Sequence, residues 1–108
     1  MSIATARWTL EDYHALLTTG MLDNQSVELL QGKIAQMSPE GPLHSNRIRQ
    51  SAKILRQQVS EDYEVSEAHP ITLNDSEPEP DIALIRAGNY DTQHPGAEDT
   101  LLAISARL

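Results

Sequence analysis

The sequence predicts a mixed α/β domain of the α+β kind, with a mixed sheet and flanking helices. Two stretches carry apolar residues at helical spacing, and several short apolar runs are bounded by Pro, Gly, Asn or Asp. Two of these runs are separated by only two residues, which is typical of a tight hairpin. A chain of 108 residues is long enough for one domain with a modest core.

The composition limits what the protein can do. There is no cysteine, which excludes a disulfide scaffold, a thiolate zinc site and a cysteine nucleophile. Because no apolar run reaches the length of a membrane span or a signal peptide, we expect no membrane partner and a cytoplasmic location. The net charge of −8 argues against a strongly nucleic-acid-binding surface.

The first expected element is a short amphipathic helix. Thr9 begins a capping-box-like segment, with acids in the first turn, where the helix dipole favours negative charge. Gly20 is placed to end the helix in a left-handed cap. The apolar stripe consists of Leu10, Tyr13, Leu16 and Leu17.

A hairpin is expected next, from Val27–Leu30 and Lys33–Met37 around Gln31 and Gly32. Glu28 is an acid within an otherwise apolar strand, which is costly unless its side chain is paired, hydrated or bound to a cation. The alternative is that Glu28 faces solvent, since it alternates with Val27 and Leu29.

The longest expected element is a helix that starts at Pro42 and runs for about four turns. His44 lies in its first turn, as either a boundary residue or a ligand. Four of the eight basic residues fall on this helix, where they either meet phosphate or form an ordinary solvated face. They are Arg47, Arg49, Lys53 and Arg56.

Further strands are expected beyond this helix. Tyr63–Ala68 alternates like a strand with one hydrated face, and Leu101–Ile104 has the composition of a buried strand. Nothing after Leu101–Ile104 is expected to cover it, and pairing with a second copy of the chain would protect such an edge. We therefore expect a homo-oligomer, most simply a dimer.

The segment from Glu77 to Arg86 carries the strongest chemical signal. Pro80 restricts Glu79 to extended geometry and suits the first position of a strand. The apolar run Ile82–Ile85 follows, so the carboxylate of Asp81 lies directly before a buried strand. Fixed carboxylate oxygens are what a divalent cation requires, although acids beside prolines also mark solvated loops.

Five segments, in order, resemble the Uma-type family of putative restriction endonucleases, which belongs to the PD-(D/E)XK nuclease superfamily. They extend over nearly the whole chain, and no one of them is specific alone. The segments are Trp8–Tyr13, Glu28–Ile34, Met37–His44, Glu79–Leu84 and Tyr90–Asp99, the last containing His94-Pro95-Gly96-Ala97-Glu98-Asp99.

The resemblance implies a restriction-endonuclease-like core that hydrolyses DNA phosphodiester bonds with Mg²⁺ or Mn²⁺. Asp81 matches the first acid of the nuclease signature, and Glu28 matches an additional acid from the N-terminal hairpin. His44 matches a histidine at the start of the helix that packs on the sheet. The expected catalytic residues are Asp81, Glu28 and His44, with Asp81 and Glu28 as metal ligands.

The sequence departs from the family at Ser105, where the second signature acid is expected. A neutral hydroxyl offers one weak oxygen and no charge to a divalent cation. The catalytic lysine and later elements of the family would lie beyond this position, so residues 1–108 are expected to form one incomplete, C-terminally truncated domain with little or no cleavage activity. The alternative is a non-catalytic remnant or interaction module that oligomerises through its terminal strand.

Overall fold

The computed structural model describes residues 6–105 and shows a mixed α+β fold, which confirms the predicted class. Its helices are α1 (Leu10–Thr18) and α2 (Pro42–Gln58), with a short 3₁₀ turn, η1 (Ala97–Asp99). A two-stranded sheet pairs β1 (Val27–Leu30) with β2 (Lys33–Gln36). A three-stranded sheet has the order β3 (Tyr63–Ser66), β4 (Ile82–Arg86), β5 (Thr100–Ile104).

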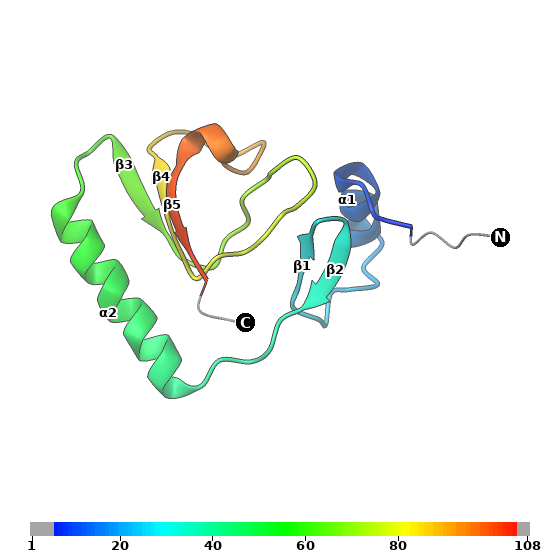
Figure 1. Cartoon of the computed structure of the whole chain (residues 1–108), viewed down its shortest axis with the longest axis horizontal. Helices are drawn as coiled ribbons and strands as arrows, with labels where there is room; N and C mark the ends of the chain where they lie inside the picture. Colours follow the sequence, from blue (N-terminus) through cyan, green and yellow to red (C-terminus); the bar gives the residue numbers. More distant parts are fainter. Residues whose placement is uncertain (1–5, 106–108) are drawn as a thin grey trace.

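The α1 helix and the β1–β2 hairpin form one end of the elongated molecule (Figure 1). The side-chain hydroxyl of Thr9 accepts a hydrogen bond from the backbone N–H of Asp12, as the capping pattern predicts. Gln31 and Gly32 both have positive φ angles, which is the geometry of a two-residue hairpin turn. Tyr13, Val27 and Leu29 form the buried core of this end.

The β3–β4–β5 sheet forms the other end, with α2 alongside β3 (Figure 1). Both strand pairs are antiparallel, and an isolated parallel bridge joins Thr72 to Gly96. β4 is the central strand and is buried from Ile82 to Ile85. Ile71, Ala83 and Ile85 form a second core cluster, against which Tyr90 packs.

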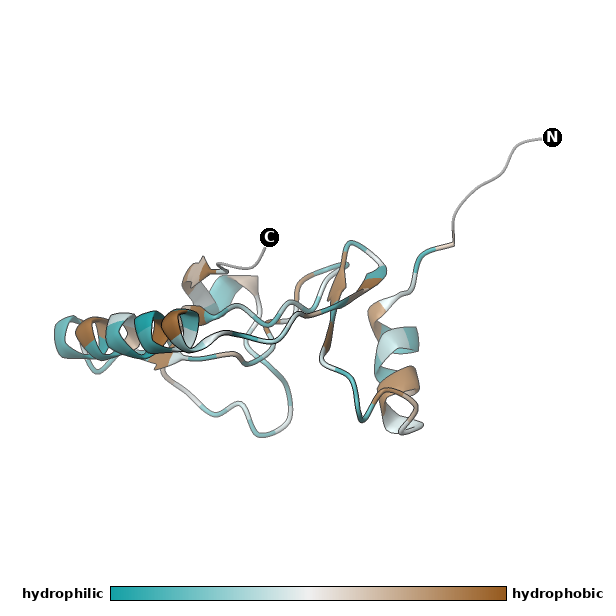
Figure 2. Ribbon diagram, turned by 90° about the horizontal axis from the view of Figure 1, so that it is seen from below, coloured by the Kyte–Doolittle hydropathy of each residue, from teal (hydrophilic) through white to brown (hydrophobic). Residues whose placement is uncertain are grey.

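The predicted long helix is present, but it packs only lightly. Ala52 is its one fully buried residue, while Leu43 and Ile54 are exposed. Figure 2 shows hydrophobic bands alternating with hydrophilic ones along α2. Arg56 forms an ion pair of 2.8 Å with Glu67, which anchors the C-terminal part of α2 beside β3. No described helix is long and apolar enough to cross a membrane.

The segment that precedes β4 also joins the two ends of the molecule. Leu29 of β1 bridges Glu77 in antiparallel fashion, and the N–H of Glu77 donates to the Leu29 carbonyl over 2.7 Å. The N–H of Gly32 donates to the carbonyl of Asp75, and the N–H of Gln31 donates to the Ser76 hydroxyl. The hairpin is thereby attached to the segment that leads into β4.

Two sequence predictions need correction. The strand expected over Tyr63–Ala68 ends at Ser66, because Ala68 adopts a positive φ of 56° that no strand can accommodate. The strand expected at Leu101–Ile104 is present, but its residues are exposed rather than buried. Within residues 6–105, β5 pairs with β4 on one side only, which leaves its other edge open.

Candidate metal centre

Asp81 lies directly before β4 with only 1% of its surface exposed. The preceding Pro80 is also buried and has no N–H of its own to satisfy. The backbone N–H of Ala68 donates to the carbonyls of Pro80 and Asp81, at 3.1 and 3.3 Å. The left-handed turn at Ala68 therefore holds the backbone that carries the carboxylate.

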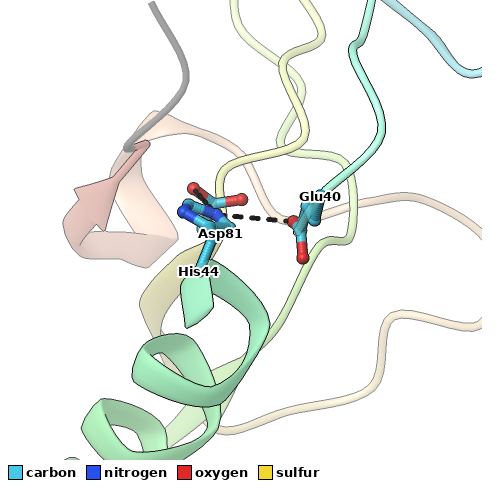
Figure 3. A group of neighbouring side chains, drawn as sticks. All are labelled: Glu40, His44 and Asp81. Carbon is cyan, nitrogen blue, oxygen red and sulfur yellow. Dashed lines mark ion pairs between the residues drawn. The ribbon is translucent and has the colours of Figure 1, made fainter. Parts of the chain in front are cut away.

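His44, in the first turn of α2, and Glu40, in the loop before α2, meet Asp81 (Figure 3). The Nε2 atom of His44 lies 3.4 Å from Oδ2 of Asp81 and 3.6 Å from Oε1 of Glu40. The side chains of His44 and Glu40 are 27% and 29% exposed, so solvent can reach the cluster from their side. Two elements that are far apart in sequence thus bring three potential metal ligands together.

The donor set can hold a divalent cation. Its ligand atoms, one from each of the three side chains, all lie within 4.8 Å of one another. Carboxylate oxygens suit Mg²⁺ and Mn²⁺, and imidazole nitrogen suits Mn²⁺ and Zn²⁺. The structure brings together Asp81 and His44, two of the three predicted site residues, and adds Glu40.

Glu28 lies outside this cluster and makes a different contact. Its Oε1 atom accepts a hydrogen bond of 3.3 Å from the N–H of Glu79, two residues before Asp81. Glu28 also lines a mainly apolar cavity of about 260 Å³ that Ser105 borders from the end of β5. Its predicted role as a metal ligand stays a prediction, while its contact fixes the approach to Asp81.

Ser105 and Asp81 lie just beyond the last pair of the β4–β5 ladder. The β4–β5 ladder pairs Ile82 with Ile104, so continuing it by one pair sets Ser105 opposite Asp81. The position where the resemblance expects the second acid therefore directly follows β5, as Asp81 directly precedes β4.

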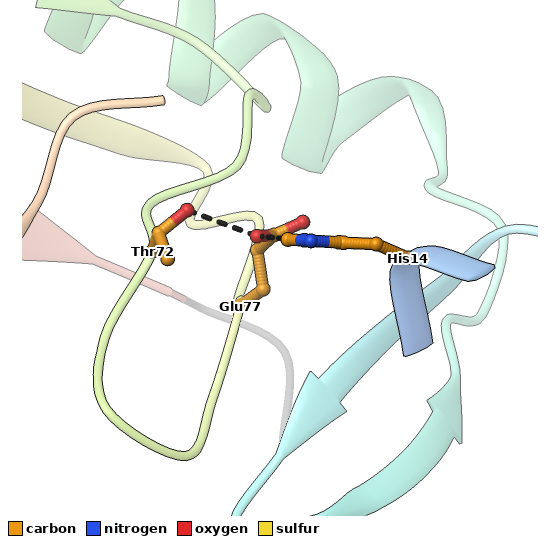
Figure 4. Close-up of polar contacts among 3 residues, drawn as sticks. All are labelled: His14, Thr72 and Glu77. Atoms are coloured by element: carbon orange, nitrogen blue, oxygen red, sulfur yellow. Dashed lines mark hydrogen bonds and ion pairs between the residues drawn. The ribbon is translucent and has the colours of Figure 1, made fainter. Parts of the chain in front are cut away.

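A second polar cluster connects α1 to the segment before β4 (Figure 4). Oε2 of the buried Glu77 lies 2.6 Å from Nε2 of His14 and accepts a hydrogen bond of 2.9 Å from the Thr72 hydroxyl. Burial, followed by the carboxylates of Glu77, Glu79 and Glu28, raises the pKa of the nearby Tyr13 phenol. The polar cluster fastens the two ends of the molecule at their interface.

Sequence reasoning did not single out Glu40 or the pairing of His14 with Glu77. Glu40 lies in a Pro-rich loop, but it precedes His44 by four residues across the start of a helix. That spacing could have drawn attention to it, because residues four apart on a helix are neighbours. His14 and Glu77 are 63 positions apart, so no local pattern could have paired them.

Comparison with known proteins identifies one family. The model of the Uma2 family, described as "putative restriction endonuclease", matches residues 10–105. This range includes all of the described helices and strands, as well as Glu28, Glu40, His44, Asp81 and Ser105. No curated protein and no solved structure matches the chain significantly.

Proposed function

The chain belongs to the Uma2 family of restriction-endonuclease-like proteins, and from that premise we propose that it is a metal-dependent DNA endonuclease domain. One observation supports this most directly. Asp81, the residue that matches the first nuclease acid, is buried and rigidly held, and it lies 3.4 Å from the metal-competent Nε2 of His44. A buried carboxylate beside an imidazole, reachable from solvent, is an arrangement that can recruit a cation.

In the proposed site, Asp81 and His44 hold the ion, which the family membership suggests is Mg²⁺ or Mn²⁺. Such an ion lowers the pKa of a bound water and neutralises charge on a phosphoryl oxygen. Asp81 contributes a fixed oxygen because Pro80 and the Ala68 hydrogen bonds restrain its backbone. His44 is held in place by the first turn of α2.

The start of α2 also supports a phosphate beside this site. The first N–H groups of a helix have no partner within the helix, and the helix dipole favours an anion there. Gly41, at the N-cap, contributes no side-chain hydrogen bond to these groups. A DNA phosphate next to His44 would meet both the cation and the positive end of a 17-residue helix.

Ser105 leads us to expect slow cleavage. With a hydroxyl opposite Asp81, the sheet offers one carboxylate where the family pattern has two. Glu28 then acts on the site through the N–H of Glu79 and not through the ion, which makes it a positioning residue. We expect Glu28→Gln to keep most of the metal affinity that Asp81→Asn removes.

The test is nicking of supercoiled plasmid with Mg²⁺ or Mn²⁺ by the wild type, Asp81→Asn and Ser105→Glu. We expect weak nicking by the wild type and faster nicking by Ser105→Glu. We expect none by Asp81→Asn or by the double variant Asp81→Asn/Ser105→Glu. Asp62→Asn removes an exposed acid and serves as a matched control. Nicking that survives Asp81→Asn, or a Ser105→Glu variant that remains inert, would reject the proposal.

A second candidate function is an interaction module that pairs through β5. Leu101, Leu102 and Ile104 are 65%, 41% and 41% exposed on a strand with an open edge. Such an edge can pair with a second copy of the chain. If it does, light scattering will show a dimer that Leu101→Lys dissociates and that Ile54→Lys, on exposed α2 surface, leaves intact. A monomer at all concentrations would exclude this role.

A further inference from the structure

We propose that Glu40, His44 and Asp81 together form a cation site that selects a first-row transition ion, such as Mn²⁺ or Zn²⁺, over Mg²⁺. The inference rests on the metal site of the proposed function and deepens it by adding a third ligand and a class of ion. It concerns cation binding, which can be measured without any DNA.

The two distances from His44 suit a shared ion better than direct contacts. Atoms that bind one ion at about 2.1 Å lie roughly 3–3.5 Å from one another. His44 Nε2 is 3.4 Å from Asp81 Oδ2 and 3.6 Å from Glu40 Oε1. Both separations exceed the roughly 2.7–3.2 Å of an N–H···O hydrogen bond.

The environment of His44 gives a second, independent indication. Its Nε2 atom is buried and has no hydrogen-bond partner, although the ring is 27% exposed overall. A buried polar atom without a hydrogen-bond partner is energetically unfavourable. A cation between this nitrogen and the two carboxylates would remove that cost.

The charges of the three groups also favour a divalent ion. In the forms that bind a cation, two carboxylates and one imidazole would carry two negative charges, and Asp81 is almost completely removed from water. Bringing carboxylates together in such a place is unfavourable unless positive charge accompanies them. A divalent ion balances the cluster without leaving an excess of either sign.

The imidazole determines which divalent ion is preferred. Mg²⁺ favours six oxygens in a strict octahedron and retains several waters, so a nitrogen ligand suits it poorly. Imidazole together with carboxylate suits Mn²⁺, Zn²⁺ and neighbouring ions. Glu40 supplies a second carboxylate from the loop before α2, in a chain where Ser105 supplies none from β5.

The experiment is calorimetric titration of the full chain with MnCl₂, ZnCl₂ and MgCl₂ in turn. We expect one ion per chain, with Mn²⁺ and Zn²⁺ bound at least about tenfold more tightly than Mg²⁺. Glu40→Gln and His44→Gln should each weaken Mn²⁺ binding by about tenfold or more. Glu61→Gln and His69→Gln remove an exposed acid and an exposed histidine, and they should change nothing.

A measurement on the unaltered protein covers the case in which a variant fails to fold. Adding Zn²⁺ to ¹⁵N-labelled chain should shift the Nε2 resonance of His44 and leave that of His69 in place. Absence of binding, equal affinity for Mg²⁺ and Mn²⁺, or an unshifted His44 Nε2 would overturn the inference. Selective binding without plasmid nicking would reject the proposed function alone, and nicking with Mg²⁺ while His44 Nε2 stays unshifted would reject the inference alone.

Discussion

Strands β4 and β5 carry the same residue types in three consecutive cross-strand pairs, yet their environments differ completely. Ile82 pairs with Ile104, Ala83 with Ala103, and Leu84 with Leu102. Ile82 is 1% exposed and Ile104 is 41% exposed. Because composition is equal, the difference comes from position: among the described residues, β4 is flanked by β3 and β5, whereas β5 has a neighbour on one side only.

The chemistry changes where the matched pairs end. Beyond Ile82 and Ile104, β4 is preceded by the buried carboxylate of Asp81, whereas β5 is followed by the exposed hydroxyl of Ser105. The buried strand β4 is thus next to the carboxylate that a metal site needs to be fixed, whereas the exposed strand β5 is next to a hydroxyl without that requirement. Substitutions in matched positions of the two strands can test this contrast.

The largest effect is expected from Ile82→Ala. Removing this buried side chain leaves a cavity, and such changes cost about 2–5 kcal/mol of unfolding free energy. Ile104→Ala, the same change in its cross-strand partner, should cost about 1 kcal/mol or less, because its side chain is partly solvated already. Urea denaturation followed by circular dichroism measures both. Equal losses would show that β5 is covered in solution.

Ser105→Glu tests the contrast between the carboxylate that precedes β4 and the hydroxyl that follows β5. A carboxylate opposite Asp81 gives β5 the kind of group that β4 already has, so the affinity for Mg²⁺ should rise by about tenfold, or roughly 1.4 kcal/mol. Calorimetry with MgCl₂ measures the change. Ser60→Glu, at an exposed position after α2, is the control and should leave the affinity unchanged. If Ser105→Glu has no effect, the register does not continue to this pair.

Leu102→Thr should have a smaller effect. Threonine favours strands and tolerates water, so at a position that is 41% exposed the change should stay within about 0.5 kcal/mol. Leu84→Thr, its partner on β4, buries a hydroxyl and should cost clearly more. Thermal melting of the two variants gives the comparison, and a large loss from Leu102→Thr would argue that this face is occupied in solution.

Local sequence signals predicted most of the elements because local physics forms them. The Thr9 cap, the Gln31–Gly32 turn and the helix starting at Pro42 each depend on residues within a few positions. The burial of Leu101–Ile104 could not be predicted in the same way. Its residues match those of β4, and only the arrangement of the sheet makes one strand central and the other an edge.

The candidate site was predictable in part. The rigid Glu79-Pro80 approach pointed to Asp81 from local geometry, and the family resemblance added His44, which the structure places beside it. Glu40 was missed because its contact depends on the direction in which the loop enters α2. The predicted role of Glu28 as a metal ligand stays a prediction, and its carboxylate accepts a hydrogen bond from the backbone N–H of Glu79.

The smallest expected effect concerns Tyr90, which follows β4 in the chain. Tyr90 packs against the cluster of Ile71, Ala83 and Ile85, and its hydroxyl donates a hydrogen bond to the carbonyl of Arg86. Desolvation is the largest cause that raises the pKa of this phenol above its ordinary value of about 10, followed by the carboxylates of Asp99 and Glu64.

The sign of the pH dependence follows from this raised pKa. The folded protein holds the phenolic proton more tightly than the unfolded chain, so the contribution to stability is complete below about pH 10 and is lost as the pH rises through the folded pKa. Urea denaturation of the wild type and Tyr90→Phe between pH 8 and 11 should therefore give a difference that is constant at first and then shrinks. A constant difference over the whole range would mean that the phenol over β4 is as solvated as the side chains of β5.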